Sequence, residues 1–464
     1  MFASIANTFA NCFKIPELKS RILFTAVMLA ICRLAAYMTM PGLDGAKLHE
    51  YMQHLPGAGG GALGLYNTFT GNAMENCAVG TLGIMPYISA TIVMQLLAAV
   101  VPSLAKLSRE NDGRVKIIKY SRYLTVLICL GQGFLMAEAW EHPTKLQFFG
   151  NFSGDLVLYK NALWWYRIQT TILLTIGTLL LMWIGEQITD RGIGNGVSLI
   201  ITIGILARLP DAFTGLVDMV RNNFNIGNAI VLLVLLVLVV AGVIALTQAQ
   251  RKIPVQYAQR AVGRKMYSGG TSFLPLRLNF AGVMPIIFAQ AILMVPQFVF
   301  KMLSQGNLWG WDWSWTARLA NDLNQGGFLF IPIYTAMILF FSYFWTATQF
   351  NELQIADDLK KNGGYVPGVR PGQATSNFLH NAMSRITLAG AIFLTVIAVV
   401  PTMLQGQMHV PQQLAQFFGG TSMLIAVGVL LDTMRQMESH LMMRHYDGFL
   451  KGGRGGGSRL RGRL

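Results

Sequence analysis

Charged residues are scarce in this sequence. Only 12% of its 464 residues are Asp, Glu, Lys or Arg, whereas 53% are hydrophobic. Soluble domains contain about 25% charged residues, and the mean hydropathy here is +0.46. This composition excludes an ordinary soluble domain and predicts a protein that crosses a membrane several times.

Cysteine and the common catalytic motifs are also sparse or missing. The four cysteines, Cys12, Cys32, Cys77 and Cys129, form no CxxC pair, which excludes a disulfide framework. No HExxH, GxSxG or Walker A motif occurs. The run RGIGNGVS at 191–198 lacks the GxGxxG spacing and a preceding strand, so we interpret it as a tight turn. We therefore expect no enzymatic activity and no cofactor.

Ten apolar segments account for the hydrophobic character, and most approach the ~20 residues that a helical span needs. An even number places both termini on the same side. Ten spans divide into two sets of five, which predicts halves of opposite orientation, as in inverted repeats. An amphipathic segment, 1–20, precedes the first span and is not a cleavable signal peptide. The apolar segments are 22–40, 79–101, 122–140, 163–185, 196–210, 226–247, 280–300, 328–349, 383–403 and 417–434.

Lysine and arginine predict which side the termini occupy. With a cytoplasmic N-terminus, 27 of the 36 Lys and Arg residues fall in cytoplasmic segments, as the positive-inside rule requires. We expect the Gly- and Arg-rich end of the tail 436–464 to be disordered. A simple basic tail is the favoured interpretation, with attraction to anionic lipids or RNA as its role. Arg33 lies within the first span, and we interpret it as structural, with a partner that the sequence does not identify.

The stretch 64–97 organises the chain. Its first part, Leu65–Cys77, is half apolar and carries three asparagines and a glutamate, so it is too short and too polar to cross a bilayer. A long apolar run then continues to Val101. A half-length element joined to a full span is re-entrant, and irregular backbone at membrane depth is tolerated only where protein covers it or water reaches it. This stretch therefore predicts a pore or a central site.

Several distinctive motifs follow one another along the chain. They are LYNTFTG (65–71), LGIMPYISATIVMQLL (82–97), RGIGNGVS (191–198), QRKIPVQYAQRAVGRKMY (250–267), LPLRLNFAGVMPIIFA (274–289), VPGVRPG (366–372) and FFGGTSMLI (417–425). In this order they resemble the motifs of the SecY/Sec61-alpha family, which forms the channel of the Sec protein translocase. The resemblance covers about residues 13–445. It implies an all-α protein with ten transmembrane helices in two inverted halves, 21–215 and 226–435, joined by a hinge, 216–225, and with a short re-entrant plug helix.

The resemblance implies a ring of aliphatic side chains that closes an hourglass pore. Two pairs in the ring are spaced i, i+4 and would share a helix face. β-Branched side chains are stiff, and an aliphatic constriction excludes ions by dewetting. Val197 departs from the isoleucine that the family favours. From spacing alone, ordinary packing or lipid-facing residues would be the better interpretation. The ring residues are Ile84, Ile88, Val197, Ile201, Ile287 and Ile425.

The resemblance also implies a plug and a lateral gate. The plug segment, residues 65–77, would be a short helix seated outside the ring, with an external interfacial helix as the alternative. The gate would lie between spans 79–101 and 280–300, where Pro86 and Pro285 are expected to kink the helices. Small residues nearby would allow close helix approach, although an ordinary helix contact is the alternative. The named residues are Leu65, Tyr66, Asn67, Phe69, Met74 and Cys77 for the plug, and Ser89, Thr91, Gln290 and Val295 for the gate.

Two basic loops, at about 248–278 and 350–382, are the docking surfaces that the resemblance implies for the SecA ATPase and for the ribosome, including its rRNA. Simple orientation signalling is the alternative. Lys265 stands where a second arginine is common, which makes a specific phosphate contact less certain. The docking residues are Arg251, Arg260, Arg264, Lys265 and Arg370. The resemblance further implies SecE and SecG as subunits and signal sequences and nascent polypeptides as clients; YidC and SecDF are further candidate partners.

The function that these expectations define is a protein-conducting channel of the bacterial inner membrane with both termini cytoplasmic. It would pass unfolded polypeptides across and release transmembrane segments sideways. A secondary transporter with inverted repeats is the alternative, but transporters carry ionisable groups or broken helices at the midplane. An intramembrane enzyme is a third class, which the missing catalytic motifs disfavour.

Overall fold

The structure is a computed structural model that describes residues 15–54, 61–109, 113–143, 156–158, 162–210, 214, 217, 226–257, 260–262, 265–267, 271–305, 314–323, 327–408 and 421–452. The first half contains α2 (Pro16–Tyr37), α3 (Gly45–His54), α4 (Gly61–Thr70), α5 (Met85–Val100), α6 (Pro102–Arg109), α7 (Gly113–Glu141), α9 (Leu163–Arg191) and α10 (Gly196–Leu206). The second half contains α12 (Ile226–Gln248), β1 (Gln250–Tyr257), β2 (Arg260–Val262), β3 (Lys265–Tyr267), β4 (Thr271–Arg277), α13 (Met284–Gln305), α14 (Ser314–Asp322), α15 (Phe330–Gln349), α16 (Glu352–Lys361), β5 (Gly364–Tyr365), α17 (Gln373–Met408) and α19 (Thr421–Gly452).

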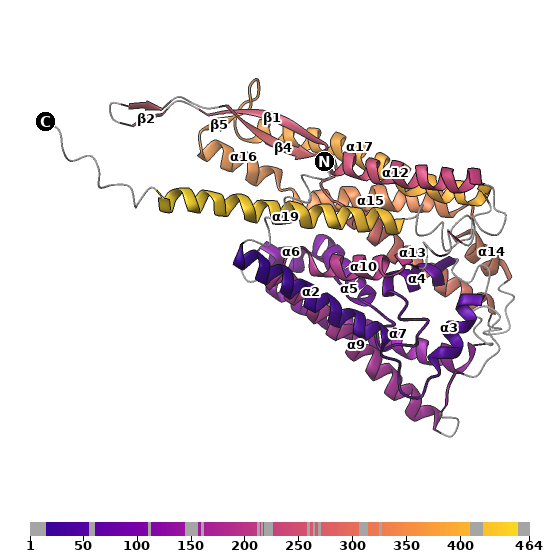
Figure 1. Cartoon of the computed structure of the whole chain (residues 1–464). Coiled ribbons are helices and arrows are strands. Elements are labelled where there is room, and N and C mark those ends of the chain that lie inside the picture. Colours follow the sequence, from indigo (N-terminus) through magenta and orange to yellow (C-terminus); the bar gives the residue numbers. More distant parts are fainter. Residues whose placement is uncertain are drawn as a thin grey trace.

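A helix occupies each of the ten predicted apolar segments. Five of the described helices are long and apolar enough to cross a membrane, and α5, α10, α12 and α13 contain shorter apolar stretches. The helices of the two halves form two groups, with α10 and α13 between them (Figure 1). The halves touch where α5 contacts α13 and where α10 contacts α19. The sheet lies at one end of the molecule, and α3 and α14 lie at the other (Figure 1).

The same short turn opens one central helix in each half. Gly83 and Gly282 both adopt positive φ, 58° and 62°, and each is followed by an aliphatic residue and then Met-Pro. A positive φ favours glycine because it lacks a Cβ atom. The turn stops helical structure upstream, so α5 begins at Met85 rather than at residue 79, and α13 begins at Met284 rather than at residue 280. This repeat is residue-level evidence for two related halves.

Helices α7 and α9 are joined by a bidentate ion pair near each end. Arg122 places Nε 3.0 Å and Nη2 2.8 Å from the two carboxylate oxygens of Glu186. Arg167 places Nε 2.7 Å and Nη2 3.1 Å from those of Glu141. Paired, in-plane guanidinium–carboxylate bonds fix geometry as well as charge. The two helices therefore form a fixed hairpin in the first half.

A small antiparallel sheet joins the two basic loops, and the sequence did not predict it. The strand order is β4-β1-β5, with Arg251 opposite Leu276 and Gln256 opposite Tyr365. Alternating burial in β1 places Ile253 and Val255 inside. Ile253 packs in a cluster with residues of β4, the 366–369 turn and α17. The two loops therefore form one platform at the sheet end.

The predicted boundaries of the terminal regions need one correction. Helix α19 continues to Gly452, so the first part of the predicted tail 436–464 is helical. Residues 1–14 and 453–464, and residues 216 and 218–225 of the predicted hinge, lie outside the described residues.

Candidate functional site

The six predicted ring residues come together at the centre. Five of them are buried in one hydrophobic cluster, with exposed fractions between 0% and 5%, and Val197 packs against this cluster half-buried. They come from α10, α13, α19 and the start of α5, so both halves contribute. The predicted ring residues therefore lie in a buried hydrophobic cluster to which both halves contribute. The five are Ile84, Ile88, Ile201, Ile287 and Ile425.

A glycine of α9 allows the first-half residues to approach each other. A Cβ atom at Gly185 would lie 3.4–3.5 Å from the side chains of Ile200, Ile84 and Val197. These distances are ordinary van der Waals contacts, so an alanine would fit here, whereas a longer side chain would meet these three residues. Gly185 therefore packs directly behind two of the predicted ring residues, a position that the sequence alone did not indicate.

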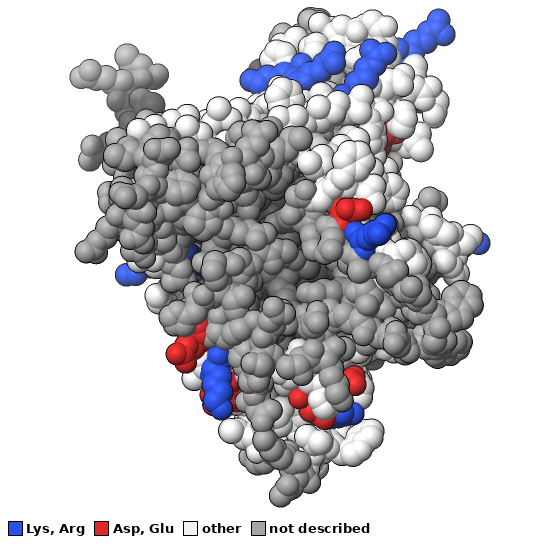
Figure 2. Space-filling view, turned by 90° about the vertical axis from the view of Figure 1, so that its right-hand side faces the viewer, with Lys and Arg blue, Asp and Glu red and all other residues white. Residues whose placement is uncertain are grey.

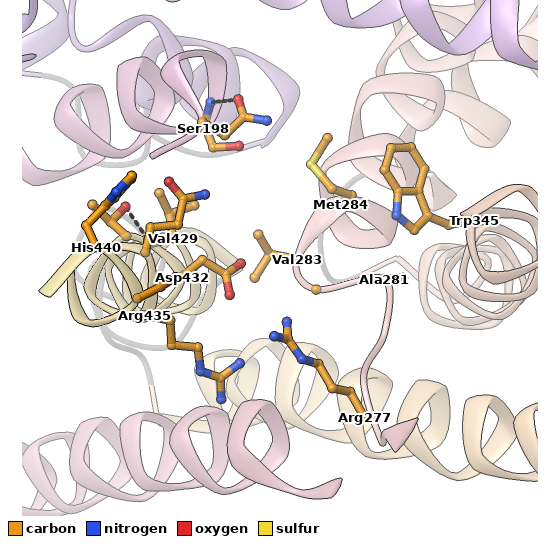
Figure 3. A pocket seen from close by; sticks show the side chains of 15 residues that line it. Ser198, Arg277, Ala281, Val283, Met284, Trp345, Val429, Asp432, Arg435 and His440 are labelled. Carbon is orange, nitrogen blue, oxygen red and sulfur yellow. Dashed lines mark hydrogen bonds between the residues drawn. The ribbon is translucent and has the colours of Figure 1, made fainter. Parts of the chain in front are cut away.

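A cavity of about 590 Å³ lies beside the ring, next to the end of β4. Asn195 and Ser198 line it from α10, and the start of α13 and the middle of α19 line it from the second half. Asp432 points into the space towards Val283, and the side chains of Arg277 and Arg435 approach each other on one side (Figure 3). The cavity is therefore polar and charged where the ring is aliphatic.

The predicted plug segment, residues 65–77, lies against the opposite end of α10. Among its named residues, Tyr66, Asn67, Phe69, Met74 and Cys77 are buried. For Leu65 the structure describes only the backbone. Along α10 the order is cavity, ring and plug segment, because Ser198 lines the cavity, Ile201 lies in the ring and Gly204 contacts the segment. The plug segment thus covers the side of the ring that faces away from the cavity.

The helical part of the plug segment is shorter than predicted. Helix α4 ends at Thr70, and residues 71–77 form turns. Gly71 and Asn72 have φ values of 66° and 70°, in the left-handed region, which ends a right-handed helix. The predicted helix over 65–77 is therefore wrong beyond Thr70.

Polar side chains bind the plug segment to its neighbours. Arg208, two residues after α10, donates to Thr68 Oγ1 at 2.8 Å, to Glu75 Oε1 at 3.0 Å and to Asn72 Oδ1. The Asn67 amide also donates to Glu75, and His49 Nδ1 of α3 lies 3.5 Å from the other Glu75 oxygen. The sequence did not predict this network. Its signal was a carboxylate within an otherwise uncharged re-entrant segment, which requires a cation nearby.

Arg33 finds its partner in the same segment. Its Nη1 donates to the carbonyl oxygen of Gly71 at 2.9 Å, and Nη2 lies 3.2 Å from the Tyr37 hydroxyl. Its guanidinium also lies over the Tyr37 ring, 5.2 Å from the centroid. The half-buried charge therefore ties α2 to the turn that ends α4.

The predicted gate helices α5 and α13 contact each other. Gln290 is buried, Ser89 and Thr91 are half-buried, and Thr91 Oγ1 donates to the Tyr87 carbonyl at 2.8 Å. Val295 lies in α13, and the structure describes only its backbone.

The expected proline kinks are wrong. Pro86 and Pro285 each occupy the second position of their helix. Proline is favoured in the first turn of a helix because an N–H group there would have no intrahelical acceptor, so its absence costs nothing. The prolines therefore start the two helices at the level of the ring.

Of the predicted docking residues, Arg251 lies on β1 and Arg370 lies in the turn that follows β5, whereas Arg260 and Lys265 lie on the separate β2–β3 pair. Arg251 and Arg370 are exposed. The Arg370 turn is held by Gly368 and Gly372, with φ of 82° and 104°, and by a 2.9 Å bond from Thr375 Oγ1 to the Arg370 carbonyl. At the opposite end, some Lys and Arg stand beside Asp or Glu in the centre and lower part of the view, and others lie at the upper edge and at the two sides (Figure 2). Arg260 and Lys265 are described by backbone alone, and Arg264 lies outside the described residues.

Fold and site together define a polytopic helical membrane protein whose two halves meet in a buried hydrophobic cluster. The sequence model of the SecY family matches residues 78–434. The protein translocase subunit SecY of Chlamydia trachomatis serovar D is 39% identical and aligns over 96% of this chain and 98% of its own. That of Thermus thermophilus is 40% identical over 98% and 99%. The chain belongs to the SecY family.

Solved structures share the fold. One described as a protein-conducting channel has a TM-score of 0.60 at 15% identity and covers 90% of this chain and 91% of its own. A SecY structure whose plug domain is described as stabilising the closed state has the same score and coverage at 17% identity. Sec61 from a canine ribosome–channel complex has a TM-score of 0.59 at 16% identity, with the same coverage. The predicted ten-helix, two-half architecture is confirmed.

Proposed function

We propose that this chain is a protein-conducting channel that passes unfolded polypeptides through the aliphatic ring. One observation supports the proposal: the six predicted ring residues, from both halves, lie in or against one buried hydrophobic cluster, with the charged cavity on one side and the buried plug segment on the other. An aliphatic constriction stays dry when narrow and so excludes ions. It also offers no specific partner to a passing peptide, which suits clients of many sequences.

The sheet end is proposed to face the cytoplasm of a bacterium, with the chain in the plasma membrane. The predicted cytoplasmic loops carry most of the Lys and Arg residues, and β1 and β4 belong to one of them. In this orientation the cavity is the cytoplasmic entrance. The plug segment then closes the external side.

The energy for transport is proposed to come from partners, SecA or a translating ribosome. The structural relatives include Sec61 in a ribosome–channel complex, which supports ribosome docking in this family. The exposed arginines of the joined loops offer one rigid basic surface for both partners. SecE and SecG are the proposed companion subunits.

The direct test is reconstitution of the chain with SecE and SecG in vesicles, with SecA, ATP and an unfolded secretory protein. Wild-type vesicles should protect the client from protease. Arg370→Glu should lower SecA-driven protection at least tenfold, because it removes a cation from the exposed tip of the 366–372 turn. Insertion coupled to ribosomes should fall less.

Lys361→Glu is the matched control, since it makes the same charge reversal at an exposed site in the same loop. It should transport at close to the wild-type rate. Near-normal SecA-driven export by Arg370→Glu would contradict the docking role. Uptake of a small solute driven by an ion gradient, without protein transport, would favour the transporter alternative instead.

A further inference from the structure

We propose that Arg208 is a positioning residue that holds the plug segment in its seat and so sets how readily the closed channel opens. The inference rests on the proposed function. Its basis is that one guanidinium binds Thr68, Asn72 and Glu75 at once. Thr68 belongs to α4, whereas the other two lie beyond the break at Gly71. A single side chain thus fixes both parts of the plug segment.

The geometry suits an arginine better than a lysine. A guanidinium is planar and has five N–H donors in a fixed fork, whereas an ammonium is a point charge. Here Nε, Nη1 and Nη2 each have a different acceptor. Losing any one acceptor would leave the other two bonds in place. The seat is therefore defined in direction as well as in charge.

The position of Arg208 couples the plug segment to the ring. Ile201 lies in α10, and Arg208 follows the same helix by two residues. The α10 backbone also packs directly against the plug segment. A Cβ atom at Gly204 would lie only 3.1 Å from the Phe69 carbonyl oxygen and 3.4 Å from the Gly71 nitrogen. When α10 moves outward to widen the ring, the Arg208 bonds must stretch or carry the plug segment along.

The environment makes the contact strong yet reversible. The side chains of Arg208 and Glu75 are only 15% and 12% exposed. Removing one partner of such a pair leaves a poorly hydrated charge, which is costly. Once the segment has moved away, water can hydrate both groups. The pair therefore opposes displacement mainly at its start.

The test uses native Cys77, which is fully buried in the plug segment. In a variant whose other three cysteines are replaced by alanine, a membrane-impermeant maleimide is added on the external side of the membrane, which the plug segment is proposed to close. Arg208→Gln should raise the rate of Cys77 labelling about tenfold and raise resting ion conductance. Arg167→Gln is the matched control, because its pair with Glu141 is similarly buried, at 20% and 4% exposure, and joins α7 to α9. It should leave both readings at the wild-type level.

A double variant separates pairing from general weakening. Arg208→Gln combined with Glu75→Gln should label no faster than the faster single variant, because the pair is already broken. A Leu379→Cys protein without the native cysteines reports unfolding, since Leu379 is fully buried in α17 in a cluster that contains no described residue of the plug segment. Unchanged Cys77 labelling in Arg208→Gln, or equal increases in Arg167→Gln, would overturn the inference. So would faster labelling of L379C when Arg208→Gln is added.

Glu75→Gln replaces Arg208→Gln as the test variant if the latter does not fold. Glu75→Gln alone must then raise the rate of Cys77 labelling, and an unchanged rate overturns the inference. Protein transport is measured in the same vesicles. If the wild type does not transport protein, the proposed function is contradicted. If the wild type transports protein but Arg208→Gln leaves the Cys77 labelling rate unchanged, only the role of Arg208 is contradicted.

Discussion

Replacing Ile425 with asparagine is expected to open the channel partially at rest. Ile425 is fully buried where the two halves meet. Burying such a side chain contributes about 1.5–3 kcal/mol, and an amide at this place would hold water. A loss of about 2 kcal/mol from the closed state corresponds to a roughly 30-fold larger open fraction. Single-channel conductance in planar bilayers and export of a client with a defective signal sequence should both rise.

The controls separate the ring from general polarity. Leu430→Asn places the same side chain on the same helix at a position that is 44% exposed, and it should leave resting conductance unchanged. Ile425→Leu keeps an aliphatic side chain of equal size and should also stay closed. Two further ring substitutions, Ile201→Asn and Ile287→Asn, are measured in the same way. If all three variants keep wild-type conductance and still reject the client with the defective signal sequence, these residues do not seal the pore.

A cross-link between α5 and α13 is expected to stop both transport and membrane insertion. The two helices contact each other and carry Ile88 and Ile287 of the ring. Ser89→Cys and Val295→Cys, chosen by family position, should form a disulfide in the resting protein, which requires Cα atoms within about 7 Å. With the bridge formed, protease protection of a secretory client and insertion of a membrane protein should fall below one tenth. Reduction should restore both.

Each single cysteine variant serves as its own control and should stay active under oxidation. The native cysteines are replaced by alanine, so that no other bridge can form. Full membrane insertion with the bridge quantitatively present would exclude this seam as the exit towards lipid. Block of insertion alone, with normal export, would limit the seam to sideways release.

The sequence predicted the arrangement of helices well because hydrophobic spans and positive-inside charges follow directly from the bilayer. The ring residues could be placed through family motifs, and the structure brings them together; their role in sealing stays a prediction. The helix starts were wrong by several residues at α5 and α13. Positive φ at Gly83 and Gly282 decides those starts, and a glycine within an apolar run gives little sign of it.

Long-range polar contacts and the sheet lay beyond the sequence for a different reason. Arg208 lies near the end of the predicted span 196–210, and its acceptors lie more than 130 residues earlier in the chain. Likewise β5 pairs with β1 although α13 and α15 lie between these strands in the sequence. Such contacts depend on how the halves fold together. Local patterns of hydropathy and propensity contain no information on that pairing.

The path of the polypeptide is the central claim, and site-specific photocross-linking tests it most directly. A photoreactive residue replaces Ile201 or Ile287 of the ring, or Ile392, which is 50% exposed on α17. A client arrested halfway through transport is then irradiated in vesicles. The account predicts adducts with the client at Ile201 and Ile287 and only background at Ile392. Background at both ring positions, in vesicles that export the client normally, would contradict it.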